Sequence, residues 1–304
     1  MMSKVVGIGA CVMDTLITVP HYPTEDTKLR AASTKLVGGG PTATGIVAVA
    51  KLGIDAEYIG VLSDDSTGDF LIGDFRKYGV GVDNITKLGG YRAFTSCIWL
   101  SAEGGTRTCV FDKGNLPPLS LNKNQKDAIK SAKLLMVDGN EMSAAVEAAK
   151  IARENGVKVL YDCGGLYPDV DKLLALTDIM IPSEEFSLGH TGEKDVYKAA
   201  EKLYEMYHPS YVVITRGKLG GLLYDGKEYT EYPIYPAEVV DSNGAGDVFH
   251  GAFASAVVRG YSPIKCCHFA SCVSALKCTG VGARESVPDF DTTVEYLRRN
   301  GYEL

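Results

Sequence analysis

The chain has 304 residues, 45% of them hydrophobic and 23% charged, which is typical of a globular protein with a sizeable core and excludes the disordered and fibrous classes. Its net charge is -7 at pH 7 and its basic residues form no run, so we expect neither a nucleic-acid partner nor an anionic membrane partner. No stretch approaches the about 20 apolar residues that cross a bilayer, and no secretory signal pattern opens the chain, so we expect a cytoplasmic protein.

Apolar runs rich in β-branched residues alternate with helical patterns along most of the chain. The expected strands are residues 4–10, 56–62, 133–138, 157–162, 178–182 and 211–215. The expected helices lie near residues 42–52, 68–78, 143–155 and 194–206. Strands this continuously apolar are covered on both faces, so we predict an α/β fold, a three-layer α/β/α sandwich with a mainly parallel central sheet. No linker or repeat interrupts the pattern, which predicts one domain over residues 1–304.

Two segments break this alternation, residues 14–37 and residues 91–111. Each contains short alternating stretches and turn signals, which predict antiparallel strands that lie apart from the main sheet. We expect them to form a small antiparallel β lid over one edge of the sheet. Such a lid can exclude water from a site and complete the site on closure.

Eight cysteines are spread along the chain, and we interpret them as free, mostly buried thiols. The group Cys266, Cys267, His268, Cys272 and Cys278 contains no C-x-x-C pair and lies in an apolar, alanine-rich helical pattern. This pattern favours core packing over a zinc site.

Two glycine-containing stretches carry incomplete nucleotide motifs. GIGACV at 7–12 has Val12 in place of the third glycine of the dinucleotide fingerprint, and no helical pattern follows it, which argues against an oxidoreductase. GLLYDGKE at 221–228 has glutamate after Lys227 where a P-loop needs Ser or Thr, and its YDGK predicts a hairpin turn.

Residues 241–247, DSNGAGD, precede an apolar run of helical period. We expect the N–H groups of Gly244, Ala245 and Gly246 to be free at the helix N-terminus, where the helix dipole favours an anion. Asp247 in the first turn either complements the dipole or accepts a proton from a hydroxyl that attacks phosphorus. The bare backbone on both sides of Ala245 favours the second role.

The DSNGAGD segment resembles the C-terminal signature of the PfkB, or ribokinase-like, family of carbohydrate kinases. GGGPTATGIVAVAKLG at 38–53 is similar to the family's glycine pair and alanine-rich helix, and TRGKLGGLLY at 215–224 is similar to its T-x-G-x-x-G segment. The resemblance covers essentially the full length. It implies a ribokinase-like fold and an ATP-dependent sugar kinase, a phosphotransferase with an alcohol acceptor that uses ATP and Mg²⁺.

The resemblance also implies a role for each matching residue. The general base would be Asp247, and the hole for the transferring phosphoryl group would be Gly244, Ala245 and Gly246. The residues that face the sugar would be Asp14, Gly39 and Gly40. The residues that face the nucleotide would be Thr215, Gly217, Gly220 and Gly282.

In related kinases the residue at Asp241 helps to hold a monovalent cation near the anion hole. The resemblance therefore makes Asp241 and Ser286, with main-chain oxygens of residues 278–286, candidate ligands of potassium. Such a cation would stiffen the hole and add positive charge behind it. The residue types fit, and whether this chain binds K⁺ is left open by the sequence.

Two positions depart from the family pattern. Thr44 replaces a substrate-side Asn, and it cannot offer both an amide donor and a carbonyl acceptor to the sugar. In the N-x-x-E element, which is tied to magnesium, Ser183 and Phe186 replace Asn and Glu. Either Glu184 or Glu185 substitutes indirectly, or magnesium is held mainly through ATP and water.

Arg92 and Arg107 fall on the expected lid strands. They either cover a solvated face or point inward and bind a phosphate, sulfonate or carboxylate on the sugar. An inward orientation would favour an acidic or phosphorylated sugar. The lid aromatics Tyr91, Phe94 and Trp99 either pack within the lid or stack on a base, and stacking would indicate a nucleoside kinase.

Two alternatives to a sugar kinase therefore remain: a nucleoside kinase of the same family, and a non-catalytic sugar- or nucleotide-binding protein on the same fold. The presence of Asp247 argues against a pure binding protein, which has no need of a base. The altered Ser183 and Phe186 positions favour the binding protein. Lid strands in this fold often pair between subunits, so we expect a homodimer through the lid by analogy.

Overall fold

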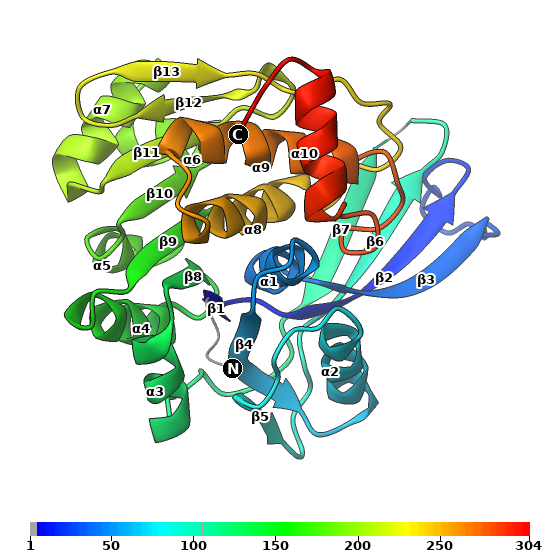
Figure 1. Ribbon diagram of the computed structural model, residues 1–304. Coiled ribbons are helices and arrows are strands. Elements are labelled where there is room, and N and C mark those ends of the chain that lie inside the picture. The colour runs from blue at the N-terminus through cyan, green and yellow to red at the C-terminus, as the bar shows by residue number, and fades with distance from the viewer. Residues whose placement is uncertain (1–4, 105) are drawn as a thin grey trace.

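A nine-stranded sheet forms the centre of the computed structural model, which describes residues 5–104 and 106–304 (Figure 1). The strand order is β13-β12-β11-β10-β9-β8-β1-β4-β5. These strands are β1 (Val5–Ile8), β4 (Ala56–Ser63), β5 (Ile85–Leu88), β8 (Leu134–Asp138), β9 (Lys158–Cys163), β10 (Ile179–Pro182), β11 (Tyr211–Thr215), β12 (Gly221–Tyr224) and β13 (Tyr229–Tyr232). All ladders from β5 to β11 are parallel, which confirms the mainly parallel sheet.

The sheet ends in an antiparallel hairpin, and the sequence predicts the turn of this hairpin. β12 pairs antiparallel with β11 and with β13, and the β12–β13 connection is the predicted YDGK turn. Of the first expected strand, residue 4 lies outside the described residues. β5 was not predicted, because this four-residue strand is only half-buried and lacks a clear alternating pattern.

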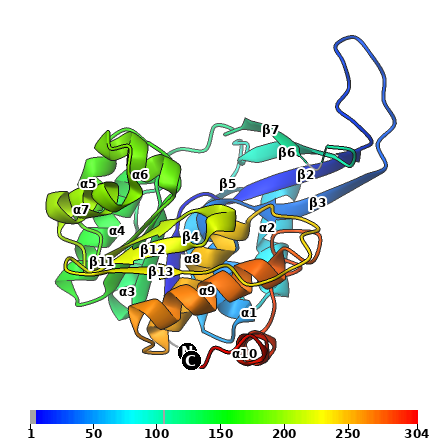
Figure 2. The same ribbon diagram turned by 90° about the horizontal axis from the view of Figure 1, so that it is seen from above.

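Helices cover both faces of this sheet, as the three-layer prediction requires (Figure 2). One face carries α1 (Pro41–Lys51), α2 (Ser66–Lys77), α8 (Ala245–Val258), α9 (Pro263–Lys277) and α10 (Phe290–Arg299). The other face carries α3 (Lys123–Ser131), α4 (Met142–Glu154), α5 (Val170–Leu174), α6 (Glu184–Thr191) and α7 (Val196–Tyr207). α1 and α8 approach closely, because a Cβ on Gly251 would lie 2.1 Å from the main-chain oxygen of Gly45.

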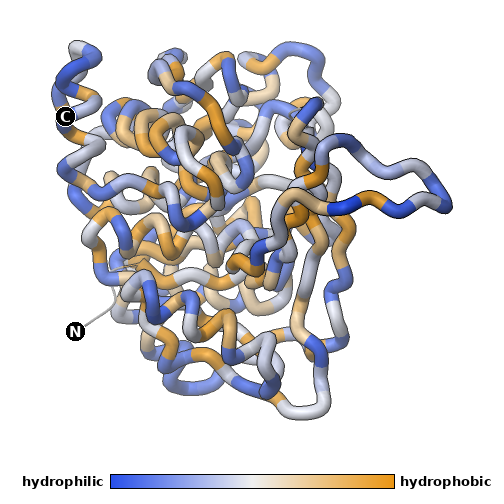
Figure 3. Tube along the Cα trace, turned by 90° about the vertical axis from the view of Figure 1, so that its right-hand side faces the viewer, coloured by the Kyte–Doolittle hydropathy of each residue, from blue (hydrophilic) through white to orange (hydrophobic). Residues whose placement is uncertain are grey.

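The two lid segments form a separate sheet of four strands in the order β3-β2-β6-β7. These strands are β2 (Val12–Val19), β3 (Ser33–Gly39), β6 (Thr95–Ser101) and β7 (Arg107–Asp112). The outer ladders are antiparallel as expected, but the central β2–β6 ladder is parallel. The β2–β3 connection projects from the body, and its tip is hydrophilic (Figures 2 and 3). Residue 105 of the expected lid lies outside the described residues.

The cysteines are free thiols, and all but Cys97 and Cys109 are buried, as predicted. Cys266, Cys267 and Cys272 lie on α9 in the core. Within the described ranges, none of the helices has the length and apolar character needed to cross a bilayer.

Candidate active site

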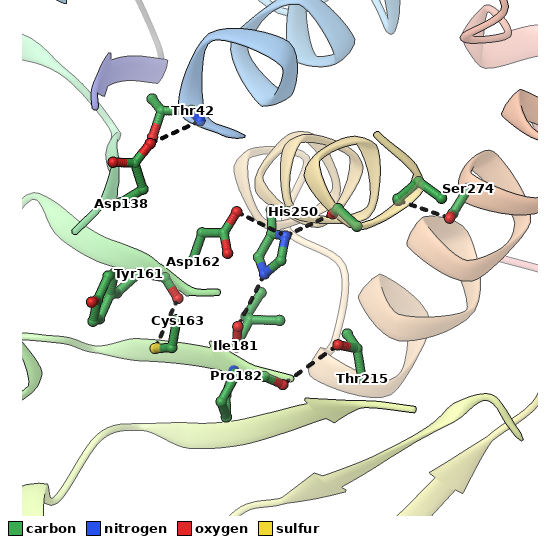
Figure 4. A network of polar contacts seen from close by, with 12 residues as sticks. Thr42, Asp138, Tyr161, Asp162, Cys163, Ile181, Pro182, Thr215, His250 and Ser274 are labelled. Atoms are coloured by element: carbon green, nitrogen blue, oxygen red, sulfur yellow. Dashed lines mark hydrogen bonds and ion pairs between the residues drawn. The ribbon is translucent and has the colours of Figure 1, made fainter. Parts of the chain in front are cut away.

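The first turns of α8 lie against the carboxyl ends of two central strands. His250 contacts the main-chain oxygen of Ile181 on β10 at 3.0 Å through Nε2, and its Nδ1 lies 3.3 Å from Asp162 Oδ2 on β9 (Figure 4). His250 Nδ1 also lies 2.6 Å from the main-chain oxygen of Gly246. His250 therefore links the Gly246 peptide to the sheet.

Burial raises the pKa of Asp162 to about 7, and the charge of His250 opposes the shift. A second buried carboxylate, Asp138 at the end of β8, accepts the N–H groups of Ala10 at 2.9 Å and Thr42 at 3.1 Å. Asp138 thereby ties the end of β1 to the N-terminus of α1. These positioning residues were not predicted, because nothing in their local sequence distinguishes them.

The turn before α8 has the geometry expected of the predicted anion hole, with one difference. Gly244 is the N-cap residue, with a φ of 72° that favours glycine, and Val248 N–H makes the first helical bond, to Gly244 O at 2.9 Å. Ala245 N–H donates to Ser242 O at 3.2 Å. The prediction that this N–H group is free was therefore wrong. Within the described part of the chain, the N–H groups of Gly244 and Gly246 have no protein acceptor. These two groups are thus the available donors for an anion.

Asp247 lies in the first turn of α8 with a raised pKa. Burial is the main cause, the charges of Asp138 and Asp14 add to it, and those of His250 and Arg107 oppose it. A carboxylate with a raised pKa is a stronger base at neutral pH. The surroundings therefore suit a role in proton transfer better than a purely structural one.

A cavity of 170 Å³ opens beside Asp247, between α1 and the lid. The predicted sugar residues Asp14, Gly39, Gly40 and Thr44 all line it. Asp14 Oδ1 accepts a hydrogen bond from Ser96 Oγ at 2.6 Å, and burial raises the pKa of Asp14. A Cβ on Gly39 would lie 1.9 Å from Asp14 Oδ2, so the glycine lets the carboxylate pack against the backbone.

Thr44 is buried and contacts Arg284, which was not among the predicted site residues. Arg284, whose side chain is 1% exposed, donates from Nε to Thr44 Oγ1 at 3.4 Å and from Nη2 to Gly39 O at 2.8 Å. Its Nη1 pairs with Asp74 Oδ2 at 2.5 Å. The guanidinium thus fixes two walls of the sugar cavity, and the Thr44 hydroxyl keeps its proton to donate.

The two lid arginines lie in different surroundings. Arg107 on β7 donates from Nη1 to Asn243 Oδ1 at 3.2 Å, which joins the lid to the anion-hole turn. Arg92 lies before β6 rather than on a strand, and it pairs with Asp112 at 3.6 Å on the exposed side of the lid. Arg107 therefore reaches the site, whereas the inward orientation considered for Arg92 does not occur.

A further cavity of 380 Å³ borders the sugar cavity, and Phe94 lines both. Lys113, Asn140 and Glu141 line it from the other side. Burial raises the pKa of Glu141, which accepts the Leu119 N–H at 3.1 Å. This second cavity therefore adds space and one positive side chain, Lys113, next to the 170 Å³ cavity.

A cavity of 590 Å³ lies on the other side of the anion hole, between α8, α9 and β13. Thr215, Gly217 and Gly220 line it as predicted for the nucleotide. Tyr235 and Ala275 add apolar surface. Gly282 was also expected to line this cavity, but its N–H group donates to Asp241 Oδ2 instead.

The residues that replace the N-x-x-E element are structural. Ser183 Oγ caps α6 by accepting the N–H of Phe186 at 3.1 Å, and Phe186 is buried in the core. Glu184 pairs with Arg216 Nε at 3.5 Å, and Glu185 is exposed. Glu184 is thus linked to Arg216, which follows Thr215 of the 590 Å³ cavity.

The oxygens of Asp241 already have protein donors. Its Oδ1 accepts Asn243 N–H at 2.8 Å, its Oδ2 accepts Gly282 N–H at 2.9 Å, and its main-chain oxygen accepts Lys277 Nζ at 2.7 Å. Ser286 Oγ donates to Gly282 O at 2.6 Å. A buried ammonium on the main-chain oxygen of Asp241, with N–H donors on both of its carboxylate oxygens, does not fit a potassium ion bound to the same residue.

Comparisons with known proteins agree with this geometry. Residues 2–289 match the pfkB family carbohydrate kinase profile. The bifunctional ribokinase/ribose-5-phosphate isomerase A of Fructilactobacillus sanfranciscensis is 25% identical over an alignment of 308 residues that covers 98% of this chain and 57% of that protein. Mouse (Mus musculus) ketohexokinase is 27% identical over an alignment of 300 residues that covers 90% of this chain and 96% of that protein. The structure of Arabidopsis thaliana ribokinase complexed with ribose and ATP superposes with a TM-score of 0.89 at 25% identity, over 98% of this chain and 99% of that one.

Proposed function

The chain belongs to the pfkB family of carbohydrate kinases, and on that premise we propose that Asp247 is the general base of its phosphoryl transfer. Its activity is ATP-dependent phosphorylation of a sugar hydroxyl. One observation carries the assignment of the site. Gly244 and Asp247 line the 170 Å³ cavity, and Ala245 and Gly246 line the 590 Å³ cavity. A sugar in the first and ATP in the second would face each other across the anion hole.

In this mechanism the sugar binds through Asp14 and the Thr44 hydroxyl. Asp247 takes the proton of the attacking hydroxyl as its oxygen forms a bond to the γ-phosphorus, and the bond from that phosphorus to the β–γ bridging oxygen breaks to leave ADP. The N–H groups of Gly244 and Gly246 and the dipole of α8 stabilise the charge that develops on the phosphoryl oxygens.

The nucleotide side is supported by Thr215, Gly217 and Gly220, whose small residues let the backbone approach ATP. Mg²⁺, when bound, neutralises phosphate charge. Since Glu184 is tied to Arg216 and Glu185 is exposed, we propose that the ion is held mainly by ATP and water.

The substrate we propose is a monosaccharide. A cavity of 170 Å³ is small beside the about 300 Å³ or more of sites for larger ligands, which argues against a nucleoside. Arg107, which contacts Asn243 of this cavity's lining, and Lys113 in the neighbouring cavity favour a sugar that carries an anionic group. Ribose is the neutral reference sugar, because a ribokinase relative binds it with ATP.

We further propose a homodimer through the lid. The apolar side chains of Leu36 and Val110 are exposed there, and a second copy of the chain would cover them.

The test is ATP-dependent ADP release over a panel of neutral sugars, sugar phosphates, acidic sugars and nucleosides. Asp247→Asn should lower kcat by about 100-fold or more, because general bases contribute at least that much, while ATP affinity changes little. Asp291→Asn is the matched control, since Asp291 is an exposed acid in the first turn of α10. A near-normal rate for Asp247→Asn would refute the base assignment, and turnover of nucleosides alone would refute the sugar.

A further inference from the structure

Lys277, the last residue of α9, carries a buried ammonium that the phosphoryl-transfer scheme does not use. Its side chain is 0% exposed, although lysine is almost never fully buried unless it is paired. Burial lowers the pKa of Lys277, and the charges of Asp241 and Asp247 are among those that oppose this shift. The ammonium therefore lies within electrostatic reach of the proposed base.

The contact that Lys277 makes is to the segment that forms the anion hole. Its Nζ donates to Asp241 O at 2.7 Å, and the two carboxylate oxygens of Asp241 bind Asn243 N–H and Gly282 N–H. Asn243 directly precedes Gly244 of the hole. The C-terminal end of the α9 dipole adds negative potential that favours a cation. Lys277 thus supplies positive charge where the turn and the loop at 278–286 meet.

A free cation on the same oxygen would lie a few ångströms from this ammonium. Two like charges that close repel strongly when they are buried. We propose that Lys277 replaces a monovalent metal ion: its ammonium holds Asp241 and the loop so that the anion hole is formed, and the kinase does not need K⁺. Lys277 is then a positioning residue. The two kinetic tests of this inference rest on the proposed function, whereas the thermal-unfolding test does not.

The first measurement uses the wild-type protein. ADP release on the best sugar of the panel is followed with tetramethylammonium as the only monovalent cation, and then with K⁺ added. We expect equal rates. Activation of the wild type several-fold by K⁺ would overturn the proposal, whether or not any variant folds.

The second measurement uses Lys277→Ala, which leaves space for a small cation. We expect its rate to fall about tenfold or more without K⁺, as when one electrostatic group of such a site is lost, and to recover in part with K⁺ or methylammonium. Lys51→Ala is the matched control, because Lys51 Nζ binds Arg284 O at 3.0 Å and Glu285 O at 2.7 Å in the same loop without touching Asp241. It should gain no K⁺ dependence. A Lys277→Ala protein that is as fast as the wild type without K⁺, or slow and not restored, would overturn the proposal.

The third measurement needs no substrate. The Tm of each protein is compared in K⁺ and in tetramethylammonium at equal ionic strength. K⁺ should raise the Tm of Lys277→Ala but not that of the wild type or Lys51→Ala, because only the first has an open cation position. The same K⁺ effect on all three proteins would overturn the proposal. The Tm comparison tests the role of Lys277 even if no sugar of the panel is phosphorylated. Failure of the proposed function is therefore distinguished from failure of this inference.

Discussion

At the scale of single residues, the buried charges around the sugar cavity satisfy one another. Arg284 has its charge balanced by Asp74 and its other donors taken up by Thr44 and Gly39 O. Removing one partner of such a pair leaves the other buried and unpaired, which is costly. The pairing also explains why a short residue stands at position 44. The Thr44 hydroxyl accepts a hydrogen bond from the Arg284 guanidinium, and a longer side chain would compete with that guanidinium for the same space.

The buried pair of Asp162 and His250 gives the first prediction on stability. Burial raises the pKa of Asp162 from 3.8 to about 7, so between these values the folded state binds a proton that the unfolded state does not. The unfolding free energy should therefore decrease as pH rises through this window, and become flat with respect to this group above it. Asn cannot titrate, so Asp162→Asn should lack this contribution.

The measurement is urea unfolding of both proteins from about pH 4 to 8. The difference between their unfolding free energies should change by roughly 1 kcal/mol per pH unit inside the window. Asp291→Asn, a change at the surface, should differ from the wild type by a constant amount. A constant difference for Asp162→Asn as well would show that Asp162 keeps an ordinary pKa.

At the scale of elements, the core of the fold was predictable because periodicity reports burial. The strands of the parallel sheet are apolar without interruption, and the six expected from the sequence are present. The parallel ladder between β2 and β6 was not predictable. These strands are separated by a large part of the chain, and register between distant strands is set by packing around Leu16, Val37 and Ile98.

The site was predictable to the extent that its chemistry lies in local motifs. The DSNGAGD turn and the glycine pair gave Asp247, Gly244 and Gly39, which the structure brings to one cavity. Arg284 and Lys277 could not be found in this way. Each is a single basic residue whose burial depends on elements distant in the sequence.

The lid strand β7 carries a prediction on the pH dependence of catalysis. The positive charge of Arg107 lowers the pKa of Asp247, so Arg107→Met should raise that pKa further. Because the base must be deprotonated, the acid limb of the kcat/KM profile should move to higher pH. Arg92→Met should leave the profile unchanged, since Arg92 pairs with Asp112 and its side chain is 70% exposed. Equal profiles for both variants would contradict the role of Arg107.

At the scale of the whole molecule, the lid is poorly covered by its own chain. Its core consists of a few side chains, and every residue of β7 is exposed. Leu36 and Val110 are 53% and 67% exposed, in a sheet that stands apart from the central one. Edge strands and apolar faces of this kind are normally covered by another chain or protected by charge.

We therefore expect the wild type to be a dimer in solution and Val110→Lys to be a monomer, because a charge on Val110 would be buried without a partner in the interface. Val110 is absent from the lining of the sugar cavity, so the substitution separates assembly from substrate contacts. Met206→Lys on α7 is the matched control, an exposed apolar residue far from the lid in sequence, and should remain dimeric. Light scattering coupled to gel filtration gives the mass of each protein directly. A monomeric wild type would contradict the lid interface, and a dimeric Val110→Lys would place the interface on another surface.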